Sequence, residues 1–157
     1  MSNTFFILFV IAIFVFAIGK TIYYFIEKKK IFESCRQSNS IEIKNISGTI
    51  FIDGGNRKRW EWCIFHLLIN ENSIFLFTVS FGLIPLKIIN LLFSNKNRKN
   101  TRNPILLREY KIEKNNAVLV YYPDYMIGSK RITLNNLNQE QLLLLEKTLE
   151  GKSRRFY

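Results

Sequence analysis

A long apolar run near the N-terminus is followed by short apolar stretches separated by polar residues. The run extends from Phe5 to Ile26 and reads FFILFVIAIFVFAIGKTIYYFI. As a helix it would measure about 33 Å at ~1.5 Å per residue, which matches a hydrocarbon core of ~30 Å. Its one charged residue, Lys20, lies near the C-terminal end, where a long side chain can snorkel to the interface. The run therefore predicts a transmembrane helix.

A cleaved signal peptide is the competing interpretation of this run. It requires positive charge before the apolar core and small residues at a cleavage site after it. Residues 1–4 include no basic side chain, and the bulky Tyr23, Tyr24 and Phe25 follow the core. The pattern therefore favours an uncleaved N-terminal anchor, residues 1–26.

A second apolar stretch, residues 73–93, is too interrupted to predict another span. Pro85, Lys87 and Asn90 lie within it, and its uncharged part ends at Leu86. A transmembrane helix needs ~20 predominantly apolar residues. Basic residues are also abundant on both sides of the stretch, and a crossing would place them on opposite sides of the membrane. We therefore expect a single-pass protein.

The charges that flank the predicted span are one-sided. Lys20, Lys28, Lys29, Lys30 and Arg36 all follow its core, and no basic residue precedes it. By the positive-inside rule, the N-terminus faces outward and the remaining residues are cytoplasmic. We expect the chain in the inner (plasma) membrane of the cell.

The residues after the span divide into three parts. Residues 27–44 are polar and lack a sustained apolar face, so we expect the helix to continue briefly and a juxtamembrane linker to break near residues 37–40. Residues 45–151 form one cytoplasmic unit, which is long enough for a single hydrophobic core. Residues 152–157 form a basic tail.

Short β-branched and aromatic runs between turn residues predict an antiparallel β domain in this unit. Turn-forming residues at 53–56, 70–72 and 115–116 separate the runs into hairpins. Residues 85–93 fit either a strand or a short helix. The expected strands are Ile46–Ile52, Trp60–Ile69, Ser73–Ser80, Leu107–Glu113, Ala117–Tyr122 and Arg131–Leu134.

One helix is predicted at the end of the unit. Asn138 is a suitable N-cap, Gln141 occupies the capping-box position, and Gly151 supplies a C-terminal stop. This helix would close an open end or face of the sheet. Its apolar stripe consists of Leu142, Leu145 and Leu149 and is widened by Leu143 and Leu144.

This order of elements resembles bacterial pleckstrin-homology-like domains. The likeness is carried by the hairpin sequence HLLINENSIFLF (residues 66–77), the IPLKI element (residues 84–88) and the final strand and helix ITLNNLNQEQLLLLEKTL (residues 132–149). The resemblance covers residues 46–150 and implies an α+β fold, a split β-barrel closed by a C-terminal helix. Members of the family are often membrane-anchored and bind lipids, peptides or proteins.

The sequence contains no pattern that predicts catalysis. Its one histidine, His66, lies in the second expected strand without a nucleophile motif beside it. Cys35 and Cys63 form no C-x-x-C pair, and zinc ligands at usable spacings are absent. We expect a protein that is not an enzyme, binds no metal and uses no cofactor.

The best candidate site is a group of cations and tryptophans around the first hairpin loop, Arg57, Lys58, Arg59, Trp60 and Trp62. The cations can bind lipid phosphates, and the tryptophans can insert at the headgroup boundary. In the resembled family, basic residues of this loop contact phosphoinositide headgroups in the lipid-binding members. That family's lipid binders continue their cations into the second strand, where this chain has tryptophans. The alternative is a solvated loop followed by tryptophans in the core.

The formal net charge of +11 favours proximity to an anionic membrane surface. Nucleic-acid binding is disfavoured, because the basic loop at residues 95–103 has no interleaved aromatic residue. The first functional hypothesis is an anchored, non-enzymatic domain that holds a protein or peptide partner. Direct anionic-lipid recognition by the basic loop and neutralisation of a toxin are the alternatives. Further basic clusters are Lys96, Arg98, Lys99 and Arg102, and Lys152, Arg154 and Arg155.

Overall fold

The computed structural model describes residues 3–54, 58–81, 84–94, 103–122 and 128–152. The chain divides into two compact units, residues 1–36 and residues 37–157. The first unit contains a single helix, and the second contains a β-barrel with a C-terminal helix.

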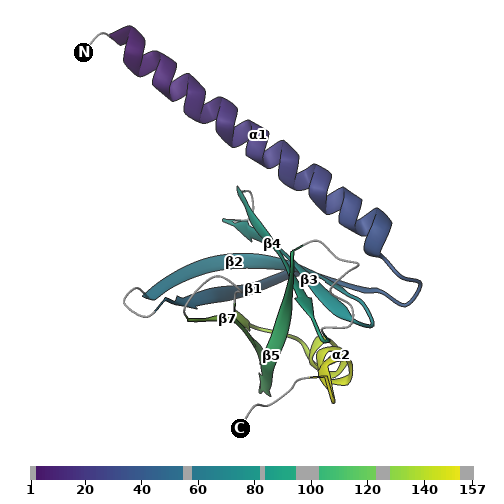
Figure 1. Ribbon diagram of the computed structural model, residues 1–157. Coiled ribbons are helices and arrows are strands. Elements are labelled where there is room, and N and C mark those ends of the chain that lie inside the picture. Colours follow the sequence, from purple (N-terminus) through teal and green to yellow (C-terminus); the bar gives the residue numbers. More distant parts are fainter. Residues whose placement is uncertain (1–2, 55–57, 82–83, 95–102, 123–127, 153–157) are drawn as a thin grey trace. The chain divides into compact units, whose positions relative to one another are not determined.

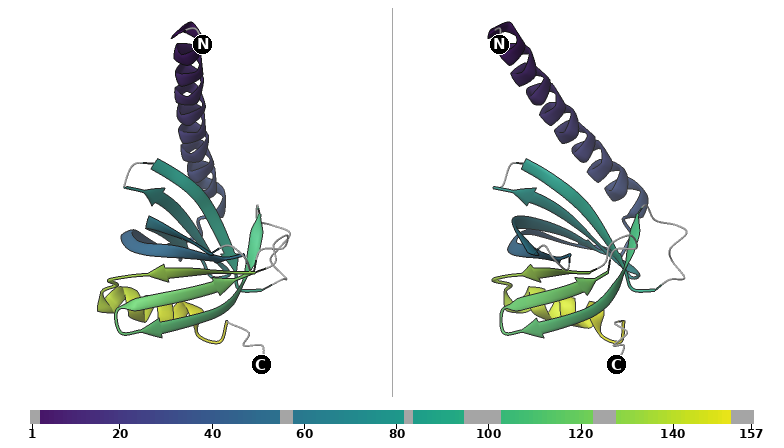
Figure 2. Two further views of the ribbon diagram at one scale, coloured as in Figure 1. Left: turned by 90° about the vertical axis from the view of Figure 1, so that its left-hand side faces the viewer. Right: turned by 60° about the vertical axis from the view of Figure 1, so that its left-hand side comes forward.

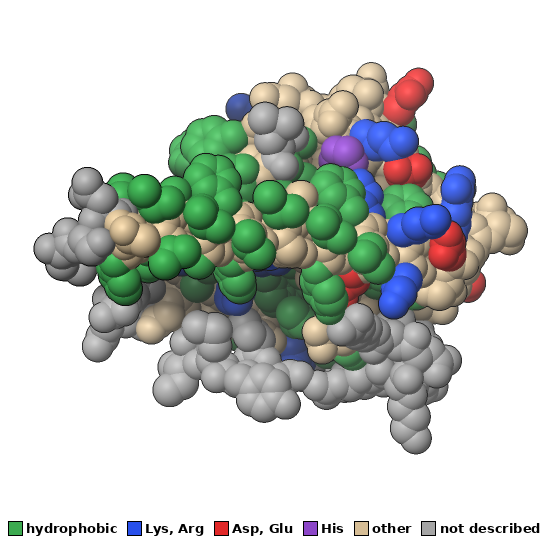
Figure 3. Space-filling model, turned by 90° about the horizontal axis from the view of Figure 1, so that it is seen from above, with side chains coloured by type: hydrophobic (Ala, Val, Ile, Leu, Met, Phe, Trp, Pro, Cys, Tyr) green, Lys and Arg blue, Asp and Glu red, His purple; other side chains and the backbone are tan. Residues whose placement is uncertain are grey.

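Helix α1 extends from Asn3 to Cys35 without interruption (Figure 1). Of the helices in the described ranges, it is the one long and apolar enough to cross a membrane. Hydrophobic side chains cover most of its length (Figure 3), and Lys28, Lys29 and Lys30 lie in its C-terminal part. The helix continues past the apolar run as predicted, and an i,i+4 ion pair between Lys29 and Glu33, 3.7 Å long, supports its last turns.

The second unit is a closed barrel of seven strands (Figures 1 and 2). All neighbouring pairs are antiparallel except β4 and β5, which are parallel over three residues, and β1 pairs with β7 to close the ring. The predicted α+β architecture is therefore confirmed. The strands are β1 (Ile41–Asp53), β2 (Lys58–Ile69), β3 (Ser73–Ser80), β4 (Ile84–Leu92), β5 (Pro104–Glu113), β6 (Asn116–Tyr121) and β7 (Ser129–Leu134).

Strand β1 begins at Ile41, so residues 41–44 are strand and the prediction that they belong to a linker is wrong. The register with β2 shifts between Ile43 and Ile46, and Asn45 adopts a φ of 58° there. This bulge keeps both isoleucines buried although they are three residues apart. The alternation that identifies a strand is broken at the bulge, which hid the first part of β1.

Two other local predictions are refined by the strand bounds. Residues 85–93, which fitted a strand or a helix, form the strand β4 from Ile84 to Leu92. The turn of the β5–β6 hairpin is Lys114–Asn115 instead of residues 115–116, because Glu113 pairs with Asn116. Lys114 adopts a φ of 48°, as a tight hairpin turn requires of one of its residues.

The barrel interior is filled by the inward-facing residues of the strands. Ile50, Phe65, Leu67, Leu76 and Leu119 have no exposed surface and belong to one hydrophobic cluster. All seven strands contribute side chains to this cluster, because residues at alternate positions of a strand lie on the same face of the sheet. Burial of this shared face drives closure of the sheet.

Helix α2, Gln139–Leu149, closes one end of this interior with the preceding Leu137 and its own Leu145 and Leu149. The predicted capping box is present. The Gln141 N–H donates to Asn138 Oδ1 (2.8 Å), and the Asn138 N–H donates to Gln141 Oε1 (3.0 Å).

The C-terminal end of α2 also agrees with the prediction, whereas one part of the apolar stripe does not. Gly151, with a φ of 70°, follows the last turn in the conformation that glycine favours. Leu144 packs against the core, but Leu143 is 59% exposed, so it does not widen the buried stripe. Adjacent helical positions are ~100° apart, and the barrel end accepts only one of these two leucines.

Two glycines allow β1 and β7 to approach at the seam of the barrel. A Cβ atom on Gly48 would collide with the carbonyl oxygen of Thr133 and lie 2.9 Å from a ring carbon of Phe65. Gly128, with a φ of 128°, brings the chain into β7, and a Cβ atom there would collide with the carbonyl oxygen of Asp53. The closed ring thus depends on missing side chains at both ends of the seam.

Gly48→Ala is expected to lower the free energy of unfolding of the barrel. Overpacking typically costs about 1–3 kcal/mol, and we expect a value near the upper end because the added methyl group must displace the backbone of β7. The measurement is urea unfolding of the full chain in detergent, followed by tryptophan emission. Gly19→Ala is the control, since nothing lies within 4 Å of the corresponding Cβ position. Equal stability of the two variants would contradict the tight seam.

Candidate functional site

The candidate motif lies on β2, and the strand divides it between two faces of the sheet. Cys63 and Phe65 point into the hydrophobic interior, so Glu61 and Arg59, at the same alternate positions, lie on the inner face. Lys58, Trp60 and Trp62 therefore lie on the outer face. Arg57 lies outside the described residues. The structure thus separates side chains that the sequence places next to one another.

The outer face carries a group of aromatic side chains, here called the aromatic surface: Phe51, Trp60, Trp62 and Phe81. Trp60 is 61% exposed, Trp62 75% and Phe81 91%. Phe51 and Trp60 are paired across β1 and β2, and their ring centroids are 4.5 Å apart. The alternative interpretation, in which the tryptophans belong to the core, is therefore wrong.

An open hollow of about 360 Å³ adjoins this surface. Trp62 and Phe81 form part of its lining, together with Ser47, Ser80 and the backbone of the β1–β2 pair. Asn135 and Asn136, which follow β7, add polar groups to its rim. The hollow is open to solvent, and it extends the aromatic surface toward the end of β7.

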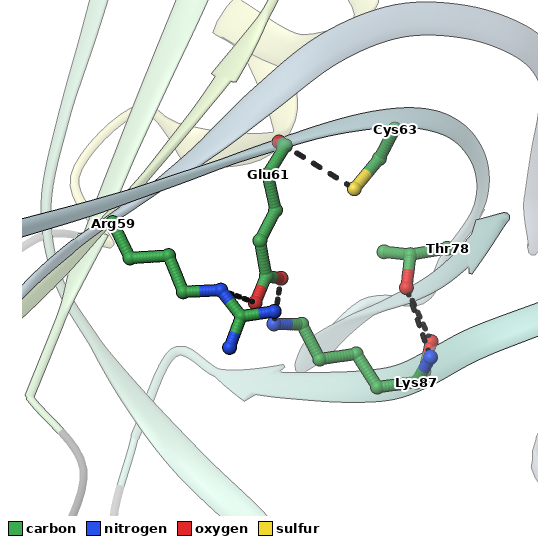
Figure 4. A network of polar contacts seen from close by, with 5 residues as sticks. All are labelled: Arg59, Glu61, Cys63, Thr78 and Lys87. Atoms are coloured by element: carbon green, nitrogen blue, oxygen red, sulfur yellow. Dashed lines mark hydrogen bonds and ion pairs between the residues drawn. The ribbon is translucent and has the colours of Figure 1, made fainter. Parts of the chain in front are cut away.

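The inner face carries an ion-pair cluster formed by Arg59, Glu61 and Lys87 (Figure 4). The Lys87 ammonium lies 2.6 Å from Glu61 Oε2, and Arg59 Nε lies 3.4 Å from Glu61 Oε1. The Glu61 side chain is 17% exposed and that of Lys87 31%, whereas that of Arg59 is 74% exposed. The Glu61–Lys87 pair is therefore the buried part of the cluster, and Arg59 contributes from the solvent side.

The backbone of Lys87 is fixed by a side chain of β3. The Thr78 hydroxyl donates to the Lys87 carbonyl (2.8 Å) and accepts from the Lys87 N–H (3.1 Å). The register of β3 and β4 shifts directly after this pair, and the hydroxyl bonds both backbone groups of Lys87 beside the bulge. Thr78 thereby holds Lys87 in the position from which its ammonium meets Glu61.

Three inward-facing groups near the cluster have shifted pKa values. Burial lowers the pKa of Lys130, Lys87 lowers it further, and Glu61 opposes the shift. Burial raises the pKa of Tyr121, and Glu61 adds to that change. Burial also raises the pKa of Cys63 to about 11, with a smaller opposing effect of Lys87.

The cluster contains more cations than carboxylates, and its thiol is a weak nucleophile. The Cys63 thiol is protonated at neutral pH because its pKa is about 11, so it is a weak nucleophile. Glu61 is the carboxylate that balances Arg59 and Lys87, and Lys130 adds a third positive charge nearby. Among the described residues, no three His, Cys, Asp or Glu side chains are grouped to hold a metal ion.

Among the described residues, strand β4 has a strand neighbour along its full length on one side only. It pairs with β3 from Ile84 to Leu92, but its pairing with β5 is limited to Asn90–Leu92. Within the described ranges, no strand pairs with Ile84–Ile89 on that second side. Because the Lys87 N–H and C=O both face Thr78, the backbone groups of Ile88 face the open side. We call Ile84–Ile89 the free edge.

The other predicted basic clusters contribute little to the described surface. Residues 96–102 and residues 154–155 lie outside the described residues. The Lys152 ammonium donates to the Glu71 carbonyl oxygen (2.6 Å) and lies 4.9 Å from the ring centroid of Phe93. Lys152 therefore links the end of α2 to the β2–β3 turn, and its ammonium group is engaged in these contacts.

Comparisons with models of known protein families and with curated proteins found no match to this chain. The barrel and C-terminal helix agree in outline with the fold that the resemblance to pleckstrin-homology-like domains implied. Membership of that family stays a prediction. The function must therefore be inferred from the aromatic surface, the ion-pair cluster and the free edge.

Glu61→Gln is expected to lower the free energy of unfolding by about 1–3 kcal/mol, because Lys87 then loses a charged partner in a largely buried position. Urea unfolding of the full chain measures the change. Glu113→Gln is the matched control, since its ion pair with Lys111 is exposed and such pairs contribute less than ~1 kcal/mol. A loss at Glu113 as large as that at Glu61 would argue against a structural role of the cluster.

Proposed function

We propose that the protein is a membrane-anchored, non-enzymatic binding domain that holds a peptide segment of a partner protein at the cytoplasmic face. The observation that carries this proposal is the free edge of β4, Ile84–Ile89. An extended peptide that pairs with this edge would satisfy its backbone N–H and C=O groups. In this proposal the barrel gains an additional strand when the partner binds.

Features of β4 suit it to this role better than to a protected edge. Natural edge strands avoid unwanted pairing by means of charges, bulges and proline. Pro85 and the bulge lie at the start of β4, and the charge of Lys87 points into the barrel toward Glu61. Ile88 and Ile89 beyond them carry no such protection. A peptide can therefore pair with the second half of the free edge.

The anchor in this proposal is α1, with its N-terminus outside the cell. Its support is the apolar run from Phe5 to Ile26 and the lysines that follow. Specific recognition of a lipid headgroup by the first hairpin loop gains less support. Of the two cations of that motif that the structure describes, Arg59 faces Glu61 on the inner face and only Lys58 lies on the outer face.

The two cysteines test the proposed orientation. In intact cells, a membrane-permeant maleimide is expected to label Cys35, and an impermeant maleimide is expected to leave it unlabelled. Cys63 should react with neither reagent until the protein is unfolded, because it is buried and its pKa is raised to about 11. Mass spectrometry of the labelled chain distinguishes the sites. Labelling of Cys35 by the impermeant reagent would show that the domain faces outward and would contradict the proposed orientation.

Site-specific crosslinking tests the peptide-binding proposal. A photo-reactive amino acid at Ile84, which is 58% exposed on the free edge, is expected to form a discrete protein adduct in native membranes. The same group at the exposed Glu113 should form none. Ile88→Pro, which removes a backbone N–H from the free edge, should abolish the adduct, whereas Ile88→Val should preserve it.

The proline variant must retain the unfolding midpoint of the unaltered chain for the comparison to hold. Adducts of equal yield at positions 84 and 113 would contradict recognition at the free edge. An adduct that persists in a folded Ile88→Pro variant would contradict strand addition as its mode.

A further inference from the structure

We propose that the aromatic surface docks on the interfacial region of the lipid bilayer to which the chain is anchored. This contact is additional to peptide binding at the free edge, and it rests on the anchor of the proposed function. It differs from recognition of a particular headgroup, because it needs no binding pocket. In this contact the side chains of Trp60, Trp62 and Phe81 partition into the headgroup boundary.

The exposure of these side chains is unusual for a soluble surface. Two tryptophans and a phenylalanine, each more than 60% exposed, lie on adjoining segments of the outer face. Contiguous apolar groups of this kind mark interaction sites. Tryptophan is also the side chain most typical of membrane interfaces, since its ring is apolar and its indole N–H needs a polar partner.

Charges beside the aromatic surface complement an anionic bilayer. Lys58 is exposed on the outer face two positions before Trp60. Arg131 is exposed on β7 and pairs directly with Phe51 across the seam. Glu61, the carboxylate nearest in sequence to both tryptophans, points to the inner face and is paired there with Lys87. Asp53 lies opposite Lys58 on this face, so the described charges immediately beside the aromatic surface are two cations and one carboxylate. The net charge there is positive, which suits an anionic lipid interface.

The connection to α1 makes such docking intramolecular. Residues 36–40 join the helix to β1, and five residues span at most about 17 Å. If α1 crosses the bilayer, the domain remains within reach of the interface at all times. Weak contacts then suffice, because the second binding event occurs at a high effective concentration. This tether and the adjacent cations favour lipid over a second protein as the occupant of the surface.

The chain reports on this contact through its own fluorescence, because it contains two tryptophans and both belong to the aromatic surface. The full chain is reconstituted into nanodiscs of phosphatidylcholine and phosphatidylglycerol, with ordinary or brominated acyl chains. We expect brominated lipid to quench tryptophan emission and the bilayer to protect it from aqueous acrylamide. Trp60→Phe and Trp62→Phe each leave one tryptophan, so the two positions are measured separately.

Charge reversal provides the matched control. Lys58→Glu combined with Arg131→Glu should reduce the quenching in anionic nanodiscs, whereas Lys147→Glu, an exposed cation on α2, should not. Identical emission in ordinary and brominated lipid, with full access to acrylamide, would overturn the docking and leave the surface to a protein partner. A chain that fails to co-elute with nanodiscs would overturn the anchor, and the docking with it.

Discussion

The pairing of β1 with two neighbours at once is the constraint on which the barrel depends. β1 pairs with β2 along nearly its whole length and with β7 from Gly48 to Asp53. A closed ring requires the last strand to meet the first in one register, and side chains at the seam would hold the strands apart. Gly48 and Gly128 remove that obstacle where the two backbones come closest. The interior can then be filled from all sides and closed at one end by α2.

The register of β1 also decides the chemistry of β2. Ile50, at the centre of the core, pairs with Glu61, so a carboxylate faces the interior instead of the solvent. A largely buried carboxylate needs a cation, and Lys87 on β4 supplies it. Lys87 reaches Glu61 because Thr78 holds its backbone at a bulge. The register of β1 and β2 thus places the polar cluster and the apolar core on the same inner face.

Features that depend on local sequence could be predicted, whereas features set by long-range pairing could not. The apolar run of α1, the Asn138–Gln141 capping box and the positions of most strands follow from composition and periodicity. The three-residue parallel contact of β4 with β5 and the bulge after Ile43 depend on which strands meet. Neither has a signal in the sequence near it.

The candidate motif illustrates the same limit. As five neighbouring residues, the cations and tryptophans of 57–62 suggested one continuous site. Alternation along β2 could have predicted that Arg59 and Glu61 oppose Trp60 and Trp62. Alternation alone could not show which of the two faces is inside. That depends on the register with β1, in which Ile50 pairs with Glu61 and Thr49 with Trp62. Lys87 and Lys130 were missed because they reach the cluster from β4 and β7.

The separation of the two faces has a consequence for how the domain can act. The aromatic surface lies on β1, β2 and the residue after β3, and the free edge belongs to β4, on the far side of β3 from β2. Phe81 adjoins the start of β4, but Ile88 lies in the second half of that strand, so contact of the aromatic surface with lipid would leave the backbone groups of Ile88 accessible. The ion pair between Glu61 and Lys87 links β2 to β4 directly, so it holds the two surfaces in a fixed relation. A peptide strand added to β4 would then be presented at a constant position relative to the docked face, which a flexible tether alone cannot provide.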